Sequence, residues 1–178
     1  MTRMKHNLKK RIWTQADFRV MGWHDCPIYA VQFADDILLD IDYILEWVVD
    51  EKAKCYRFWV APAAIQFSSP RNLQISVQAD FVNGLEIADI KQTRVGTGMY
   101  DYQIQTQEGD IRFTAKGFKQ HIRKTPVLVK SQCLTDAQRG GYPLRISESS
   151  KKTSNATTSR TPAKGVITPS LPARRRSR

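Results

Sequence analysis

His24, Asp25 and Cys26 stand side by side in the stretch MGWHDCPIYAVQF, and all three residue types are used in catalysis. A cysteine nucleophile needs an imidazole within hydrogen-bond reach, and in an extended chain His24 and Cys26, two positions apart, point to the same side. A proline follows at once, however, and no Gly-rich oxyanion turn or second histidine lies nearby in the sequence. We therefore expect a structural strand entry with a half-buried Cys26. Asp25 would accept backbone amides in an Asx-type turn, and His24 would pack beside Trp23.

Asp40 and Asp42 form a second concentration of possible chemistry, in the acid-rich segment DDILLDIDY. On a strand their carboxylates share one face about 7 Å apart, a spacing that suits a bound cation or general acid–base work. No D-x-D-x-D-G loop or His/Asp metal pattern accompanies them. The competing interpretation is that both acids lie on the solvent-exposed face of a strand and only keep that face hydrated. The candidate binding pocket that the sequence offers consists of His24, Asp25, Asp40 and Asp42.

Motifs for several common chemistries are missing from the sequence. There is no P-loop, no G-x-G-x-x-G, no G-x-S-x-G and no H-E-x-x-H. Three cysteines without a C-x-x-C pair argue against a disulfide framework and against a zinc site, and they fit a reducing cytosol. No apolar run approaches the roughly 18 residues of a membrane helix, and the basic N-terminus lacks the apolar stretch of a secretory signal. We expect a cytoplasmic protein with no cofactor, no metal and no membrane association.

These residues are expected on or beside β-strands, because the dominant hydrophobic period between residues 20 and 130 is two. In MYDYQIQTQEGDIRFTAKGF, apolar and polar positions alternate on both sides of a Glu-Gly-Asp turn, which predicts an antiparallel hairpin with one buried face. Short, closely spaced strands without helical spacers predict a mainly β fold, a single antiparallel β-sandwich or open-barrel domain. Further strands are expected at residues 28–33, 55–61, 63–67, 72–78 and 85–91.

Residues 36–50, DILLDIDYILEWVVD, fit either a strand or a helix. A helix would carry one apolar stripe and could be capped by an aspartate at its start. A strand would alternate apolar residues with Asp40 and Asp42. We favour the strand, because Ile, Val, Tyr and Trp are good strand formers and aspartate is poor in the middle of a helix.

The net charge of +11 is concentrated at the two ends of the chain. Residues 1–12 carry five Lys/Arg and no acids, and residues 136–178 carry ten Lys/Arg against two acids, which leaves −2 for residues 13–135. From Ser147 onward the chain is rich in Ser, Thr, Pro and cations, and it cannot bury enough apolar surface to offset its ordering entropy. We expect a basic arm (1–12), one β-domain (13–135) and a disordered basic tail (136–178).

Five short stretches carry a resemblance to known proteins: WHDCPIYAVQF, ILLDIDYILEWV, YRFWVAPAAIQF, NLQISV and LEIADI. Together they resemble a family of small, functionally uncharacterised bacterial β-domains with the pattern W-H-D-x-x-I, L-x-x-D-I-D-Y and F-W-V-A-P-A. The order of a His-Asp strand entry followed by alternating strands is also faintly similar to some immunity proteins of bacterial toxin systems. The likeness covers roughly residues 20–133 and implies a β fold rather than an activity.

Three classes of function follow from these observations. The first is a non-enzymatic β-domain that binds another protein, such as a toxin; the lack of catalytic signatures and the aromatic-rich body favour it. The second is a small hydrolase or ligand-binding enzyme that uses His24, Asp25 and the Asp40/Asp42 pair. The third is weak, nonspecific nucleic-acid binding through the basic ends. Convergence of the four side chains in one concave pocket would favour the enzyme, whereas scatter would favour the first class.

Overall fold

The structure is a computed structural model, and it describes residues 6–78 and 84–141. Within these residues the chain forms one antiparallel sheet of ten strands with two short helical turns. The elements are β1 (Ile12–Thr14), the 3-10 helix η1 (Gln15–Val20), β2 (Cys26–Phe33), β3 (Ile37–Asp50), β4 (Cys55–Phe67), β5 (Arg71–Val77), β6 (Leu85–Gly96), β7 (Met99–Thr106), β8 (Gly109–Ala115), β9 (Phe118–Ile122), β10 (Val127–Val129) and α1 (Asp136–Arg139).

The strands pair in the order β1-β9-β4-β3-β2-β6-β7-β8-β5, and β10 pairs with residues 58–60 of β4. The first and last strands of this path, β1 and β5, do not pair with each other, so the sheet is not closed. The prediction of a mainly β, antiparallel fold is confirmed. No helix in residues 6–78 or 84–141 is long and apolar enough to cross a membrane.

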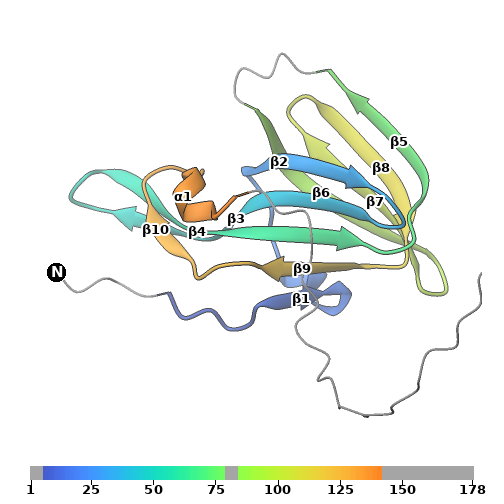
Figure 1. The fold of residues 1–178 in the computed structure, drawn as a ribbon, viewed down its shortest axis with the longest axis horizontal. Helices are drawn as coiled ribbons and strands as arrows, with labels where there is room; N and C mark the ends of the chain where they lie inside the picture. The colour runs from blue at the N-terminus through green and yellow to red at the C-terminus, as the bar shows by residue number, and fades with distance from the viewer. Residues whose placement is uncertain (1–5, 79–83, 142–178) are drawn as a thin grey trace, which may run out of the picture. The chain divides into compact units, whose positions relative to one another are not determined.

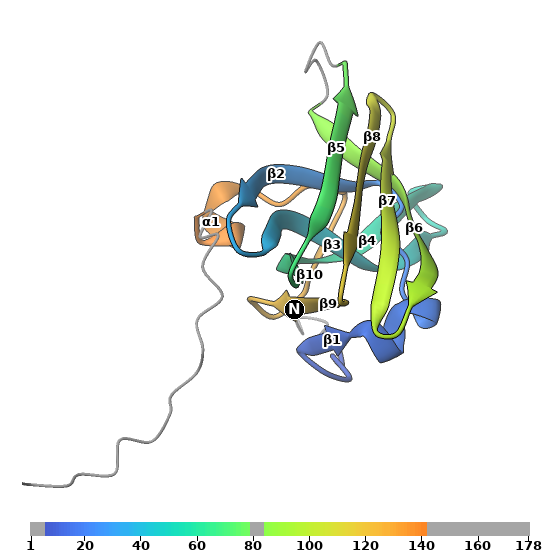
Figure 2. The same ribbon diagram turned by 90° about the vertical axis from the view of Figure 1, so that its right-hand side faces the viewer.

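The sheet bends so that its two halves pack against each other. Figures 1 and 2 show β5, β7 and β8 running across the direction of β2, β3 and β4. Phe67 of β4 lies 4.9 Å from Tyr102 of β7 and 4.8 Å from Phe113 of β8, measured between ring centroids. Three strands separate β4 from β7 in the sheet order, so only a bent sheet brings these rings together. All three side chains are buried, and each contributes about 1.5–3 kcal/mol through removal from water.

The ambiguous segment is a strand, as the sequence analysis favoured. β3 pairs with β4 along nearly its whole length, with a bulge between Ile44 and Glu46. The stretches predicted as separate strands at 55–61 and 63–67 form the single strand β4. Pro62 does not interrupt the strand, because its carbonyl oxygen still accepts the amide of Arg123 at 2.8 Å.

The predicted hairpin is formed by β7 and β8. Its turn contains Gly109, whose φ of 140° lies in a region that L side chains rarely adopt. A Cβ atom on Gly109 would lie 2.0 Å from the carbonyl oxygen of Ser76 on β5. The turn therefore has to contain glycine for β5 to approach the hairpin this closely.

The ordered chain continues past the predicted domain boundary at residue 135. α1 begins at Asp136, and Arg139 is 1% exposed. This part of the chain therefore packs on the sheet, whereas the sequence predicted a disordered tail over residues 136–178. The reason is tertiary: the side chain of Arg139 meets buried carboxylates of β3. Residues 1–5 of the predicted arm and 142–178 of the predicted tail lie outside the described residues.

Candidate functional site

Asp40 and Asp42 lie on one face of β3, and both are completely buried. The expectation that both aspartates lie on a solvent-exposed face of the strand is therefore wrong. Alternation along β3 directs Leu39 and Ile41 into the core between the two halves of the sheet and the two aspartates to the opposite face. That opposite face is covered by residues 131–141, here called the strap, which includes α1.

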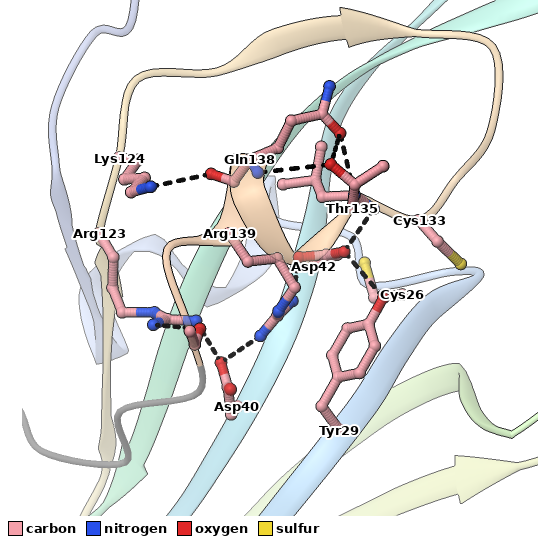
Figure 3. A network of polar contacts seen from close by, with 12 residues as sticks. Cys26, Tyr29, Asp40, Asp42, Arg123, Lys124, Cys133, Thr135, Gln138 and Arg139 are labelled. Carbon is pink, nitrogen blue, oxygen red and sulfur yellow. Dashed lines mark hydrogen bonds and ion pairs between the residues drawn. The ribbon is translucent and has the colours of Figure 1, made fainter.

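The guanidinium group of Arg139 lies between the two aspartates (Figure 3). Its Nη2 is 2.8 Å from Oδ1 of Asp40, and its Nη1 donates to Oδ1 of Asp42. The guanidinium carbon also lies 3.8 Å from the centroid of the Tyr29 ring. Arg139 thus has a carboxylate on each of two nitrogens and an aromatic face against its plane, which are the contacts that suit a guanidinium group.

Further contacts complete the charge balance around the aspartates. Nη2 of Arg123, which follows β9, donates to Oδ1 of Asp40 at 2.6 Å. The Tyr29 hydroxyl donates to Oδ2 of Asp42 at 2.9 Å, and the amide of Leu134 donates to the same oxygen at 2.7 Å. Two guanidinium groups therefore offset two fully buried carboxylates. A buried charge is costly, and it is tolerated where such pairing and hydrogen bonding replace water.

Burial acts on the titration of several of these groups. Burial raises the pKa of Asp40, against the opposing attraction of Arg139 and then Arg123. Burial likewise lowers the pKa of Arg123, against the attraction of Asp40. Burial, followed by the charge of Asp42, raises the pKa of Tyr29, so its phenol remains a proton donor. Ion pairing thus opposes the effect of burial on the charges of Asp40 and Arg123.

The turn into β2 is made by the backbone around Asp25. Asp25 has a φ of 60°, in the left-handed region, and its amide donates to the carbonyl of Ile87 at 2.9 Å. The amide of Cys26 donates to the carbonyl of Trp23 at 3.0 Å. The carboxylate of Asp25 accepts from the side chain of Gln132 at 2.9 Å, not from the backbone amides that the sequence suggested. Asp25 therefore joins the turn to the strap.

His24 and Cys26 have different environments. The His24 side chain is 68% exposed, its Nδ1 lies 3.1 Å from the carbonyl oxygen of Ala88, and its Nε2 lies 3.3 Å from Oδ1 of Asp25. Cys26 is fully buried instead of half-buried, and its Sγ accepts the amide of Ile44 at 3.5 Å. Burial raises the pKa of the Cys26 thiol to about 12. A neutral, buried thiol and an imidazole with other partners do not form a nucleophile–base pair.

The strap brings three of the four predicted site residues into one set of contacts. Asp40 and Asp42 lie beneath it, Asp25 lies at its margin through Gln132, and His24 extends to solvent beside Asp25. Two surface depressions, of about 510 and 470 Å³, are lined by other residues. In the described residues no three His, Cys, Asp or Glu side chains are grouped so that they could hold a metal ion.

Sequence reasoning missed Tyr29, Arg123, Gln132 and Arg139. One signal for the strap was present: Thr135 and Gln138 form a capping box, the S/T-x-x-E/Q pattern that marks the first turn of a helix. Nothing local connects Arg139 with an aspartate 97 positions earlier in the chain.

A second surface lies at the end of the β3–β4 hairpin that extends beyond β2 (Figure 1). Trp47 and Val49 of β3 and Tyr56 of β4 are 44%, 61% and 53% exposed, and we call these three residues the hairpin patch. Cross-strand pairing of Val49 with Tyr56 and of Trp47 with Phe58 places all four side chains on one face. The Trp47 ring meets Tyr56 at 5.7 Å and Phe58 at 4.9 Å, both edge to face.

The fold and both surfaces thus define an open antiparallel β-sheet protein with a buried ionic network and an exposed aromatic patch. Comparisons with protein-family models, curated proteins and solved structures find no match to this chain. The resemblance to small bacterial β-domains stays a prediction from short sequence patterns.

Proposed function

We propose that this protein is a non-enzymatic β-domain that binds another protein through the hairpin patch. The observation that carries the proposal is the exposure of Trp47, Val49 and Tyr56 on one face of a paired ribbon. Trp and Tyr are the residue types that most often dominate the energy of protein interfaces. Edge-to-face contacts already order the Trp47 and Tyr56 rings, so binding would cost less side-chain entropy than for free side chains.

The charges near the patch favour a protein over a polyanion as the partner. The end of the hairpin carries the acids Asp50 and Glu51 and the bases Lys52, Lys54 and Arg57. Nε of Arg57 pairs with Oδ2 of Asp50 at 2.9 Å. A patch ringed by charges of both signs has no strong attraction for nucleic acid or an anionic membrane. The expected occupant is a protein surface with an apolar centre and a polar rim.

The enzyme alternative receives less support from the contacts of the four residues. The two aspartates that it uses are buried and already paired with guanidinium groups. The nucleic-acid alternative rests largely on residues outside the described part of the chain. Three free thiols, Cys26, Cys55 and Cys133, support a reducing, cytoplasmic location. The finer role of a toxin-immunity protein rests on the faint sequence resemblance alone.

The test compares two double variants of the full chain. Trp47→Ala/Tyr56→Ala removes the aromatic part of the patch, and Leu73→Ala/Ile75→Ala removes side chains of similar exposure from β5. A partner captured from the native host by the wild-type chain is identified, purified and titrated against all three proteins. We expect the patch variant to lose at least about 30-fold in affinity and the β5 variant to lose less than about threefold.

Equal affinity of the patch variant and the wild type would refute the proposal. Light scattering of the purified chain supplies a second test. A wild-type dimer that the patch variant dissociates would assign the patch to a contact between copies of this chain, and the proposal of a different partner would be wrong.

A further inference from the structure

The strap is anchored to the sheet by few side chains. Leu134 is 6% exposed and Arg139 is 1% exposed, whereas the other residues of the strap are exposed or half-buried. Other attachments include hydrogen bonds from Gln132 to Asp25 at 2.9 Å and from Lys124 to the Gln138 carbonyl at 3.1 Å. A segment with so few buried contacts opens at a lower free-energy cost than the sheet itself unfolds.

The surface that Arg139 occupies has the composition of a binding site for a planar cation. Asp42 accepts a hydrogen bond from Nη1 of Arg139, Oδ1 of Asp40 forms an ion pair with Nη2 at 2.8 Å, and Tyr29 presents its ring at 3.8 Å. Oδ2 of Asp40 is buried and has no hydrogen-bond partner among the described residues. The carboxylates belong to β3 and the tyrosine to β2, so the site is built on the rigid sheet, whereas Arg139 comes from the strap (Figure 3).

We propose that Asp40, Asp42 and Tyr29 form a binding site for an arginine side chain of a second polypeptide, which Arg139 occupies as an internal ligand. A competing arginine would displace Arg139 and hold the strap open. In the open strap, Oδ2 of Asp42 would also lose its hydrogen bond from the Leu134 amide. The two buried residues of the strap, Leu134 and Arg139, would therefore leave the sheet together. This inference does not depend on the hairpin patch, which lies on the distal end of the hairpin.

The first experiment removes the internal ligand. Full-chain Arg139→Ala is titrated with methylguanidinium chloride up to about 20 mM, a range in which a site of millimolar affinity saturates. We expect a lowered melting temperature that methylguanidinium raises again by about 3–5 °C, with saturation. Methylammonium chloride at equal ionic strength should give less than about a third of that shift, because an ammonium group cannot bridge two carboxylates in one plane.

Two controls make the result specific. Arg112→Ala, which removes an exposed arginine paired with Asp110, should show no selective shift with methylguanidinium. Arg139→Ala/Asp42→Asn should lose the shift, because one of the two carboxylates is gone. If Arg139→Ala does not fold in buffer, the same titration is followed as recovery of tryptophan fluorescence, with the same selectivity required.

The second experiment uses the wild-type chain and hydrogen exchange at the Leu134 amide. Acetyl-arginine amide at about 20 mM should raise this exchange rate several-fold, because a ligand of the open strap increases the open population in proportion to its concentration. Acetyl-lysine amide should leave the rate within about a factor of 1.5. An Arg139→Ala chain that does not discriminate methylguanidinium from methylammonium, or an exchange rate unchanged by the arginine compound, would overturn the proposal.

Discussion

Replacing Arg139 by methionine tests whether its charge stabilises the buried network. Methionine keeps much of the side-chain length but removes the charge, so Asp42 loses its guanidinium partner. Removing one member of a buried ion pair costs about 3–5 kcal/mol. Asp42 retains the Tyr29 hydroxyl and the Leu134 amide, and Asp40 retains Arg123, so we expect a loss near the lower limit, about 3 kcal/mol. For a domain of this size that corresponds to about 10 °C in melting temperature.

The same variant in an Asp42→Asn background separates charge from packing. The asparagine oxygen can still accept the Leu134 amide, but it carries no charge that needs a partner. We therefore expect Arg139→Met/Asp42→Asn to be more stable than Arg139→Met alone by about 1–2 kcal/mol, although it carries one more substitution. Arg112→Met is the matched control: Arg112 pairs with Asp110 at 2.9 Å but is 57% exposed, so its loss should cost less than about 1 kcal/mol.

Urea unfolding followed by tryptophan fluorescence measures all of these variants in the full chain. A role of Arg139 as a buried ion-pair partner would be refuted if Arg139→Met were no more destabilising than Arg112→Met. It would also be refuted if the double variant showed the simple sum of two losses, because an additive result means that the carboxylate and the guanidinium do not stabilise each other.

Further predictions concern the hairpin turn, the end of the domain and the buried thiol. Gly109→Ala should cost more than about 3 kcal/mol in thermal unfolding because its Cβ would meet a backbone oxygen of β5, whereas Gly98→Ala, with open space around it, should cost about 1 kcal/mol. Deleting residues 136–178 should lower the melting temperature by about 10 °C or more through loss of the internal guanidinium, while deleting residues 142–178 should change it by less than about 2 °C; equal effects would contradict this. In mass-spectrometric alkylation at about pH 8, Cys26 should react at least about 100-fold more slowly than the two exposed cysteines. Because the pKa of this thiol is raised in the folded state from 9.0 to about 12, its contribution to stability should decline as the pH rises across that interval, and an increase in stability there would contradict the assignment.

The local β structure could be predicted from residue order. The alternation in residues 99–115 identified the β7–β8 hairpin, and the β-branched and aromatic content of residues 36–50 identified β3 as a strand. Both signals depend on neighbours one or two positions apart, so they can be seen without knowing the fold. The position of the turn was also readable from Glu-Gly-Asp, because glycine is the residue that adopts a backbone such as the φ of 140° at Gly109 without strain.

The faces of the strands that are covered depend on contacts between distant parts of the chain. Asp40 and Asp42 have the spacing of solvent-facing acids, and their burial follows from a strap whose arginine lies 97 positions from Asp42. The same contact moved the end of the domain beyond residue 135, into a segment whose composition predicted a disordered tail. Alternation fixes which residues share a face, but it cannot fix what packs on that face, because that depends on the bend of the sheet and on charge pairs between distant segments.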